Sequence, residues 1–209
     1  MYILFLHQPS LRYLPLKQFL KKLMTELKIE DLLSADEYDK KRDELLSIAN
    51  SERELRTVRI GNSVSLLFEN KETVQHKLQE LLRDENVIQS EKIQKKLSIY
   101  KFLLPDTNKL KASMSINSDE EEKKGIDKRV WIQIGENDRV FASSFTNLEH
   151  ADVGDYERAF LLEFDLSNLM IKDFQAGMIL YAGIDHPKYN IRTKEILKKT
   201  TASLAKDLL

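Results

Sequence analysis

Arg59 to Arg83 reads RIGNSVSLLFENKETVQHKLQELLR, and this stretch contains the clearest change of secondary-structure pattern in the chain. Up to Phe68, apolar and polar residues alternate, which is typical of a β-strand with one buried face. After Asn70, apolar residues recur every three or four positions, which predicts an amphipathic helix. Asn70 is a favourable N-cap, because its side chain can accept a hydrogen bond from an amide of the first turn. The stretch therefore predicts a strand followed directly by a capped helix.

The flanking sequence predicts hairpins and further helices. Residues 57–60 and 63–68 form a candidate hairpin around Gly61-Asn62, and a capping box from Ser34 to Glu37 starts a helix that we expect to end near Asn50. Strands are predicted at 109–116, 130–134, 139–142, 158–166 and 178–184. Helices are predicted at 90–100, after Ser118, after Ser167 and over 194–209. In the last helix, the packing residues would be Ile196, Leu197, Leu204 and Leu208. Regular strand–helix–strand alternation is absent. We therefore predict an α+β fold, a mostly antiparallel sheet built from hairpins with helices packed on one face.

Composition excludes several classes of function. The 33 basic and 34 acidic residues give a net charge of −1, so the chain has no general attraction to nucleic acid. It contains no cysteine, which excludes disulfides, thiolate zinc sites, cysteine-ligated iron–sulfur clusters and a cysteine nucleophile, and fits a reducing cytoplasm. No apolar run is long enough to span a bilayer, so we expect no membrane insertion.

Residues 1–23 differ from the rest of the chain. They hold two of its four prolines and no acidic residue, and Met24 opens a segment that reads like an ordinary protein start. We expect 1–23 to be an N-terminal extension upstream of the natural start at Met24, and 24–209 to be a single α+β domain. The alternative is a short helix over 14–23 that packs on the domain. Deleting 1–23 should change the free energy of unfolding by no more than about 1 kcal/mol, unless the apolar run at 2–6 adds a strand to a sheet.

Catalytic and nucleotide-binding motifs are absent from the sequence. There is no GxxxxGK[ST], GxGxxG, GxSxG or HExxH pattern, and the six glycines do not cluster. We therefore expect no cofactor.

One face of the helix after Asn70 carries the best candidate site. Glu72, His76 and Glu80 are spaced four residues apart, which places them on the same side of a helix. Carboxylates and an imidazole are suitable ligands for a divalent metal, but a single helix cannot enclose one. The additional ligand would come from Asp185-His186, so Glu72, His76, Glu80 and His186 are the weak metal candidates. The alternatives are a solvated helix face and a turn at His186.

Several segments resemble a bacterial family known as domain of unknown function 3501. They are Phe68 to Arg83, and then Leu104-Pro105-Asp106, Asn108 to Ala112, Val130 to Ile132 and Gly183 to Pro187. The resemblance covers about residues 25–209, and Lys77 departs from it where the family has glutamine. Genes of this family are often found beside those for rubrerythrin-like iron proteins and iron–sulfur oxidoreductases.

The resemblance implies a cytoplasmic accessory protein in redox or oxidative-stress handling, with such a redox protein as its partner. We predict a small-ligand-binding or partner-binding protein, with a homodimer left open. The alternative is an enzyme with a carboxylate/histidine site, and the sequence leaves enzyme activity undecided. The binding candidates are Glu69, Asn70, Glu72, His76, Gln79, Glu80, Asp185 and His186.

Overall fold

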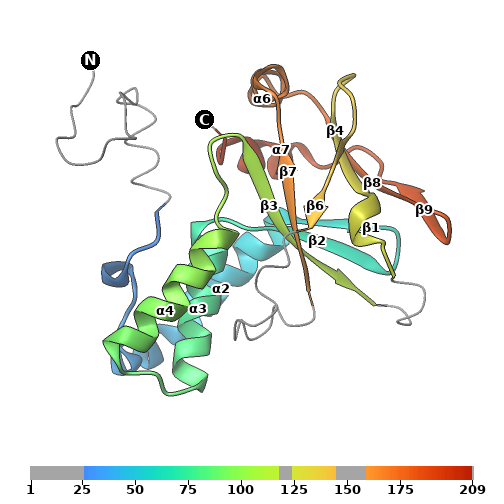
Figure 1. Cartoon of the computed structure of the whole chain (residues 1–209). Helices are drawn as coiled ribbons and strands as arrows, with labels where there is room; N and C mark the ends of the chain where they lie inside the picture. The colour runs from blue at the N-terminus through green and yellow to red at the C-terminus, as the bar shows by residue number, and fades with distance from the viewer. Residues whose placement is uncertain (1–25, 118–123, 145–158, 209) are drawn as a thin grey trace, which may run out of the picture.

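The computed structural model describes residues 26–117, 124–144 and 159–208 (Figure 1). It confirms the α+β class and the antiparallel pairing of the strands, which form two sheets. The first sheet has the order β1-β2-β3-β7-β6, with strands at Thr57–Ile60, Val64–Phe68, Lys109–Ile116, Phe160–Asp165 and Ser143–Ser144. The second has the order β5-β4-β8-β9, with strands at Val140–Phe141, Val130–Ile134, Leu180–His186 and Tyr189–Arg192.

The predicted hairpin at Gly61 is confirmed. Strands β1 and β2 pair from Thr57 opposite Leu67 to Ile60 opposite Val64. Gly61 has a φ of +64°, and a Cβ atom at this position would lie 2.4 Å from the hydroxyl oxygen of Tyr189. Glycine is therefore required here both by the backbone conformation and by the close approach of the β9 side chain.

The larger hydrophobic core lies between the two sheets. Alternate residues of β2 point into it, as predicted, and the corresponding residues of β7 do the same. Its buried members include Leu66, Phe68, Met114, Leu162, Phe164, Val130, Ile132, Ala182 and Ile184. Helices α6 (Asn168–Gln175) and α7 (Lys198–Ala205) add Ile171, Phe174 and Leu204 to the same core.

A second core joins a helical layer to the outer face of the first sheet. The layer contains the 3-10 turns η1 (Ile29–Asp31) and η2 (Lys101–Leu103) and helices α2 (Ala35–Arg56), α3 (Lys71–Asp84) and α4 (Ser90–Tyr100). Leu161 of β7 points away from the first core and packs among Leu27, which precedes η1, and the helical residues Val74, Leu78, Leu82, Leu97 and Tyr100. The helical layer lies at the lower left of Figure 1, and β8 and β9 lie on the right.

Some boundaries differ from the prediction. Helix α2 continues past Asn50 to Arg56, because no glycine or proline interrupts it and β1 begins at the next residue. Strand β8 extends through His186, which pairs with Tyr189, so the prediction of a turn at His186 was wrong and the turn follows at Pro187.

The C-terminal helix is shorter than predicted. It begins at Lys198, and Leu197, expected to pack, has 64% of its surface exposed because it precedes the helix as its N-cap. A third 3-10 turn, η3, spans Asp127–Arg129 and directly precedes β4. The extension at 1–23 and the helix after Ser118 fall outside the described residues. Within the described ranges, no helix has both the length and the apolar character needed to cross a bilayer.

Candidate functional site

Glu69 lies at the junction of β2 and α3, where it is almost completely buried. Its carboxylate accepts hydrogen bonds from Ser113 Oγ at 2.6 Å and from Thr73 Oγ1 at 2.5 Å, and Lys77 Nζ lies 3.8 Å away. The next residue, Asn70, accepts from the Thr73 amide and thereby caps α3, as predicted. Because its carboxylate is enclosed by these partners, Glu69 anchors the start of α3 to β3 and is not available to a ligand.

Arg56 fixes the end of α2 against the same junction. Its guanidinium is buried and donates to the carbonyl oxygens of Phe68 and Glu69, at 2.8 and 3.3 Å. It also contacts Ser203 Oγ and the Asp207 carboxylate at the C-terminal end of the chain. A single buried cation therefore connects α2, β2 and α7.

The predicted polar face of α3 is covered by α2 instead of being solvated. His76 and Gln79 retain only 7% and 5% of their surface. The reading of this face as solvated was wrong for His76 and Glu80, because α2 presents Tyr38, Arg42 and Arg53 to them as partners. Glu72, on the same face, is exposed.

A chain of hydrogen bonds fixes the tautomer of His76. The Tyr38 hydroxyl donates to Glu80 Oε1 at 2.6 Å, so its oxygen is left to accept from His76 Nε2 at 3.3 Å. The other ring nitrogen, Nδ1, lies 3.4 Å from Arg53 Nη2, which can only donate. The arrangement therefore assigns a neutral imidazole with its proton on Nε2. We call Arg53, His76, Tyr38, Glu80 and Arg42 the relay.

Charges and burial within the relay reinforce this assignment. Burial and the neighbouring Arg53 lower the pKa of His76 below its ordinary value of 6.5, which favours the neutral ring. Arg42 binds both carboxylate oxygens of Glu80, at 2.9 and 2.7 Å, and lowers the pKa of Glu80 to about 2. Burial and the hydrogen bond to Glu80 raise the pKa of Tyr38, which stays protonated. His76, Tyr38 and Glu80 are thus each held in one protonation state near neutral pH.

Gln79 and Gln75 connect α3 to the segment before α2. The Gln79 side-chain amide accepts a hydrogen bond from the Leu33 N–H and donates one to the Leu33 C=O, each at 2.9 Å. Gln75 donates to the carbonyl oxygen of Asp31 at 2.6 Å, and Lys71 pairs with the Asp31 carboxylate at 3.0 Å. These bonds hold residues 31–33 against α3.

A pocket of about 350 Å³ lies between these two sets of bonds. Residues of α2 form a largely apolar wall, with Leu45, Ile48 and Ala49, and residues of α3 form a polar wall. The remaining lining side chains, from either wall or from the segment before α2, are Asp31, Leu33, Tyr38, Lys41, Glu72, Gln75, His76 and Gln79. We call this space the α2–α3 pocket. It brings together three of the candidates predicted from the sequence, namely Glu72, His76 and Gln79.

Asp185 and His186 belong to a different part of the molecule. Asp185 accepts from Trp131 Nε1 at 2.9 Å and from Arg139 at 2.6 Å, and the Arg139 guanidinium lies 4.1 Å from the centre of the Trp131 ring. His186 Nδ1 accepts from the Lys188 amide at 3.3 Å. Both residues are on β8 in the second sheet, on the other side of the view from α3 (Figure 1).

The weak metal candidates do not converge. Among residues 26–117, 124–144 and 159–208, no group of three or more His, Asp or Glu side chains is placed to hold a metal ion. In His76 the ring nitrogen that carries a lone pair faces a guanidinium, and both carboxylate oxygens of Glu80 bind Arg42. Neither side chain presents a free ligand atom.

Sequence reasoning missed the α2 residues of the site. None of Tyr38, Arg42 and Arg53 was among the candidates predicted from the sequence. Their partners on α3 are between 23 and 42 positions away in the chain, so helical spacing alone could not connect them. The signal that was available is a helix with ionisable residues at i, i+4 and i+8 beside another helix that carries arginines.

The comparisons with known proteins agree with the resemblance seen in the sequence. A family model described as a protein of unknown function (DUF3501) matches residues 26–208. A crystal structure of a novel protein of unknown function from Burkholderia pseudomallei is similar to this chain with a TM-score of 0.81 and 30% sequence identity, over 88% of this chain and 99% of that chain. No curated protein matches the chain.

Proposed function

We propose that this chain, which belongs to the DUF3501 family of proteins of unknown function, is a non-catalytic protein that binds a small amine with an apolar body. The observation that carries this proposal is the α2–α3 pocket, which three binding candidates line. Its volume of about 350 Å³ is at the small end of the range for ligand sites.

The two walls of the pocket suit a ligand with two chemically different parts. Leu45, Ile48 and Ala49 offer apolar contact to the body of a ligand. The polar groups deepest in the opposite wall are already satisfied, since His76 bonds within the relay and Gln79 bonds Leu33. A preformed wall of this kind requires little reorganisation when a ligand binds.

The ionisable groups at the pocket favour a cationic end group. Two carboxylates, Asp31 and Glu72, and one ammonium, Lys41, line the space. Asp31 is paired with Lys71, whereas the exposed Glu72 has no ion pair with another described residue. We therefore assign Glu72 as the group that would pair with the amine.

The enzyme alternative has less support from the same contacts. A general base needs a lone pair directed at its substrate. The Nδ1 lone pair of His76 is directed at Arg53, and Glu80 is held by Arg42 and Tyr38. Asp185 and His186, which would complete such a site, lie in the second sheet.

The cellular part of the proposal rests on the resemblance and on the absence of cysteine. We place the protein in the cytoplasm as an accessory to a redox protein. Affinity capture from the native cell tests this part. Recovery of a rubrerythrin-like protein or an iron–sulfur oxidoreductase would support it, and recovery of the bait alone would count against it.

Titration with benzylamine, followed by amide NMR spectroscopy, tests the binding site. We expect a dissociation constant on the order of 1 mM, which is normal for a ligand of this size. Shifts should concentrate at Ala49, Glu72 and His76. Benzyl alcohol should bind more weakly and benzoate weakest, because the latter would be repelled by Glu72.

Two variants and a matched control complete the test. Ala49→Leu should fill the pocket and abolish binding, and Glu72→Gln should weaken binding roughly three- to tenfold. Ala202→Leu, a similar enlargement of an exposed helical alanine far from α3 in the sequence, should leave binding unchanged. Undiminished binding by a folded Ala49→Leu variant would refute the assignment of the site.

A further inference from the structure

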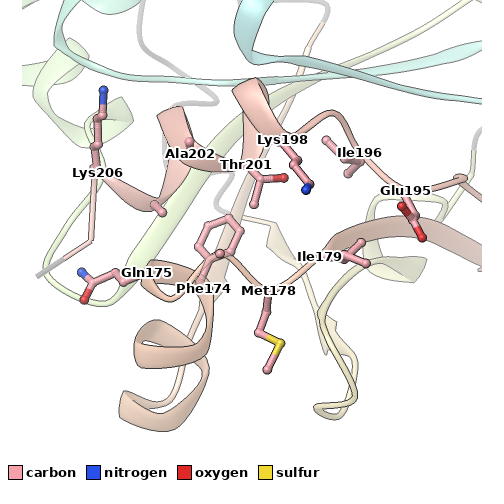
Figure 2. A pocket seen from close by; sticks show the side chains of 12 residues that line it. Phe174, Gln175, Met178, Ile179, Glu195, Ile196, Lys198, Thr201, Ala202 and Lys206 are labelled. Carbon is pink, nitrogen blue, oxygen red and sulfur yellow. The ribbon is translucent and has the colours of Figure 1, made fainter.

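A second pocket lies between α6 and α7, and its volume is about 370 Å³. We call it the α6–α7 pocket. Its walls are the end of α6 with the segment that leads to β8, the residues just before α7, and one face of α7 (Figure 2). The lining residues are Phe174, Gln175, Gly177, Met178, Ile179, Glu195, Ile196, Lys198, Thr201, Ala202, Ala205 and Lys206. None of them was a candidate in the sequence analysis.

The spacing of small residues on α7 creates this pocket. Thr201, Ala202 and Ala205 follow Lys198 by three, four and seven positions, so all four lie on one side of the helix. Figure 2 shows the Phe174 ring below Thr201 and Ala202, with Met178 and Ile179 on the lower right. The floor is therefore apolar, and it is large enough for a short hydrocarbon chain.

Thr201 supplies an unsatisfied polar group to the pocket. Its side chain is 5% exposed, and its hydroxyl oxygen is buried without a hydrogen-bond partner among the described residues. Native proteins rarely leave a buried hydroxyl unpaired, because the group loses its hydrogen bonds to water on burial. In Figure 2 the Thr201 hydroxyl and the Lys198 ammonium lie on the same side of the hollow.

The charges that line this pocket favour an anion. Lys198 and Lys206 contribute two positive charges and Glu195 one negative charge, which leaves a net lining charge of +1. All three side chains are exposed, and neither lysine has an ion pair with another described residue. A carboxylate near Lys198 could accept from the ammonium and from the Thr201 hydroxyl at once.

From these observations we infer that the α6–α7 pocket binds a small anionic amphiphile, a carboxylate with a short hydrocarbon chain. The carboxylate lies between Lys198 and Thr201, and the chain lies over Phe174 and Ile196. This site does not depend on the proposed amine site, because the two pockets share no lining residue.

A titration with butyrate, hexanoate and octanoate tests the inference, with NMR spectroscopy of the full chain to locate the bound ligand. Each added methylene should tighten binding roughly fourfold until the pocket is filled, since burying one CH₂ changes affinity by about this factor. Shifts should map to α6 and α7. Hexanol, which lacks the charge, should bind more weakly than hexanoate.

Variants separate the role of each group. Lys198→Gln should weaken octanoate binding roughly five- to tenfold, whereas Lys206→Gln, at the C-cap of α7, should change it less than about twofold. Thr201→Val should weaken it roughly threefold or more. Ala202→Leu should abolish it, and Ala49→Leu in the α2–α3 pocket should have no effect.

Three outcomes would overturn the inference. Affinity that does not change with chain length would show that the apolar floor is not used. Equal effects of the two lysine substitutions would show only general attraction to a basic surface. Sedimentation with phosphatidylglycerol vesicles without saturable binding of monomeric octanoate would indicate a membrane surface instead of a pocket ligand.

Discussion

The α2–α3 pocket and the α6–α7 pocket are similar in size, about 350 and 370 Å³, but differ in how their polar groups are satisfied. In the first, the buried His76 and Tyr38 are bonded within the relay, where Arg53 Nε is the buried donor that has no partner among the described residues. In the second, the buried hydroxyl of Thr201 has no partner among the described residues. Polar groups of the first pocket therefore hold the fold together, whereas Thr201 contributes nothing to stability by hydrogen bonding.

The largest loss of stability is expected from Arg56→Met, because Arg56 connects α2, which lines the first pocket, to the chain around α7, which lines the second. Arg56 connects the end of α2 to β2 and to Asp207 beyond α7, so its loss leaves a carboxylate and two carbonyl oxygens without their buried partner. We expect the free energy of unfolding to fall by about 3–5 kcal/mol in chemical denaturation. The exposed Arg59→Met is the control and should change it by less than about 0.5 kcal/mol. A similar small effect at Arg56 would show that the connection is not formed.

A smaller loss is expected from Tyr38→Phe, which interrupts the relay. The substitution removes the donor to Glu80 and the acceptor for His76 and keeps the buried ring. Unfolding free energy should fall by about 1–2 kcal/mol. Tyr181→Phe removes a hydroxyl that has no hydrogen bond with a described residue, and should be nearly neutral. Equal effects of both substitutions would contradict the relay.

Thr201→Val should change the free energy of unfolding in the opposite direction. It replaces a buried, unpartnered hydroxyl by a methyl group of similar shape. The protein without ligand should become more stable by up to about 1 kcal/mol, or stay unchanged. Thermal unfolding of this variant beside Tyr38→Phe gives the comparison directly. Destabilisation by more than about 1 kcal/mol would mean that the hydroxyl has a partner in the folded protein.

The smallest change in the free energy of unfolding is expected from the titration of His76. Its pKa is lower in the folded protein than its ordinary value of 6.5. The unfolded chain therefore binds more protons as the pH falls through 6.5, and the folded state loses stability in that direction. The dependence should disappear in His76→Gln and persist in His186→Gln. Stability that rises as the pH falls from 7.5 to 5.5 would contradict the assignment of a neutral ring.

The parts of the fold that the sequence predicted well are those with a local cause. Alternation placed Leu66 and Phe68 in the core, and the short polar side chain of Asn70 predicted the start of α3. The division of the strands into two sheets was not predictable, because periodicity shows which face of a strand is buried but not which other strands cover it. Strand β9 was also missed. Only two residues separate it from β8, so no longer turn segment in the sequence marks where one strand ends and the next begins.

The candidate site was predicted in part. The spacing on α3 correctly placed Glu72 and His76 on one side, and both line the pocket. The pairing of Glu80 with Arg42 and of His76 with Arg53 depends on how α2 packs against α3, which local spacing cannot give. The α6–α7 pocket was missed entirely. It arises from small side chains, and the sequence alone does not show that Thr201 and Ala202 lie opposite Phe174.

The central claim is that His76 is a neutral, fully bonded wall of the α2–α3 pocket and not a catalytic or metal-binding residue. Long-range ¹⁵N–¹H NMR spectroscopy of the imidazole rings at pH 7 tests it directly, with His76→Gln to assign the signal. The relay predicts a neutral His76 with its proton on Nε2, and a spectrum that does not change when zinc is added. A proton on Nδ1, a charged ring, or a zinc-dependent shift of this signal would contradict the account.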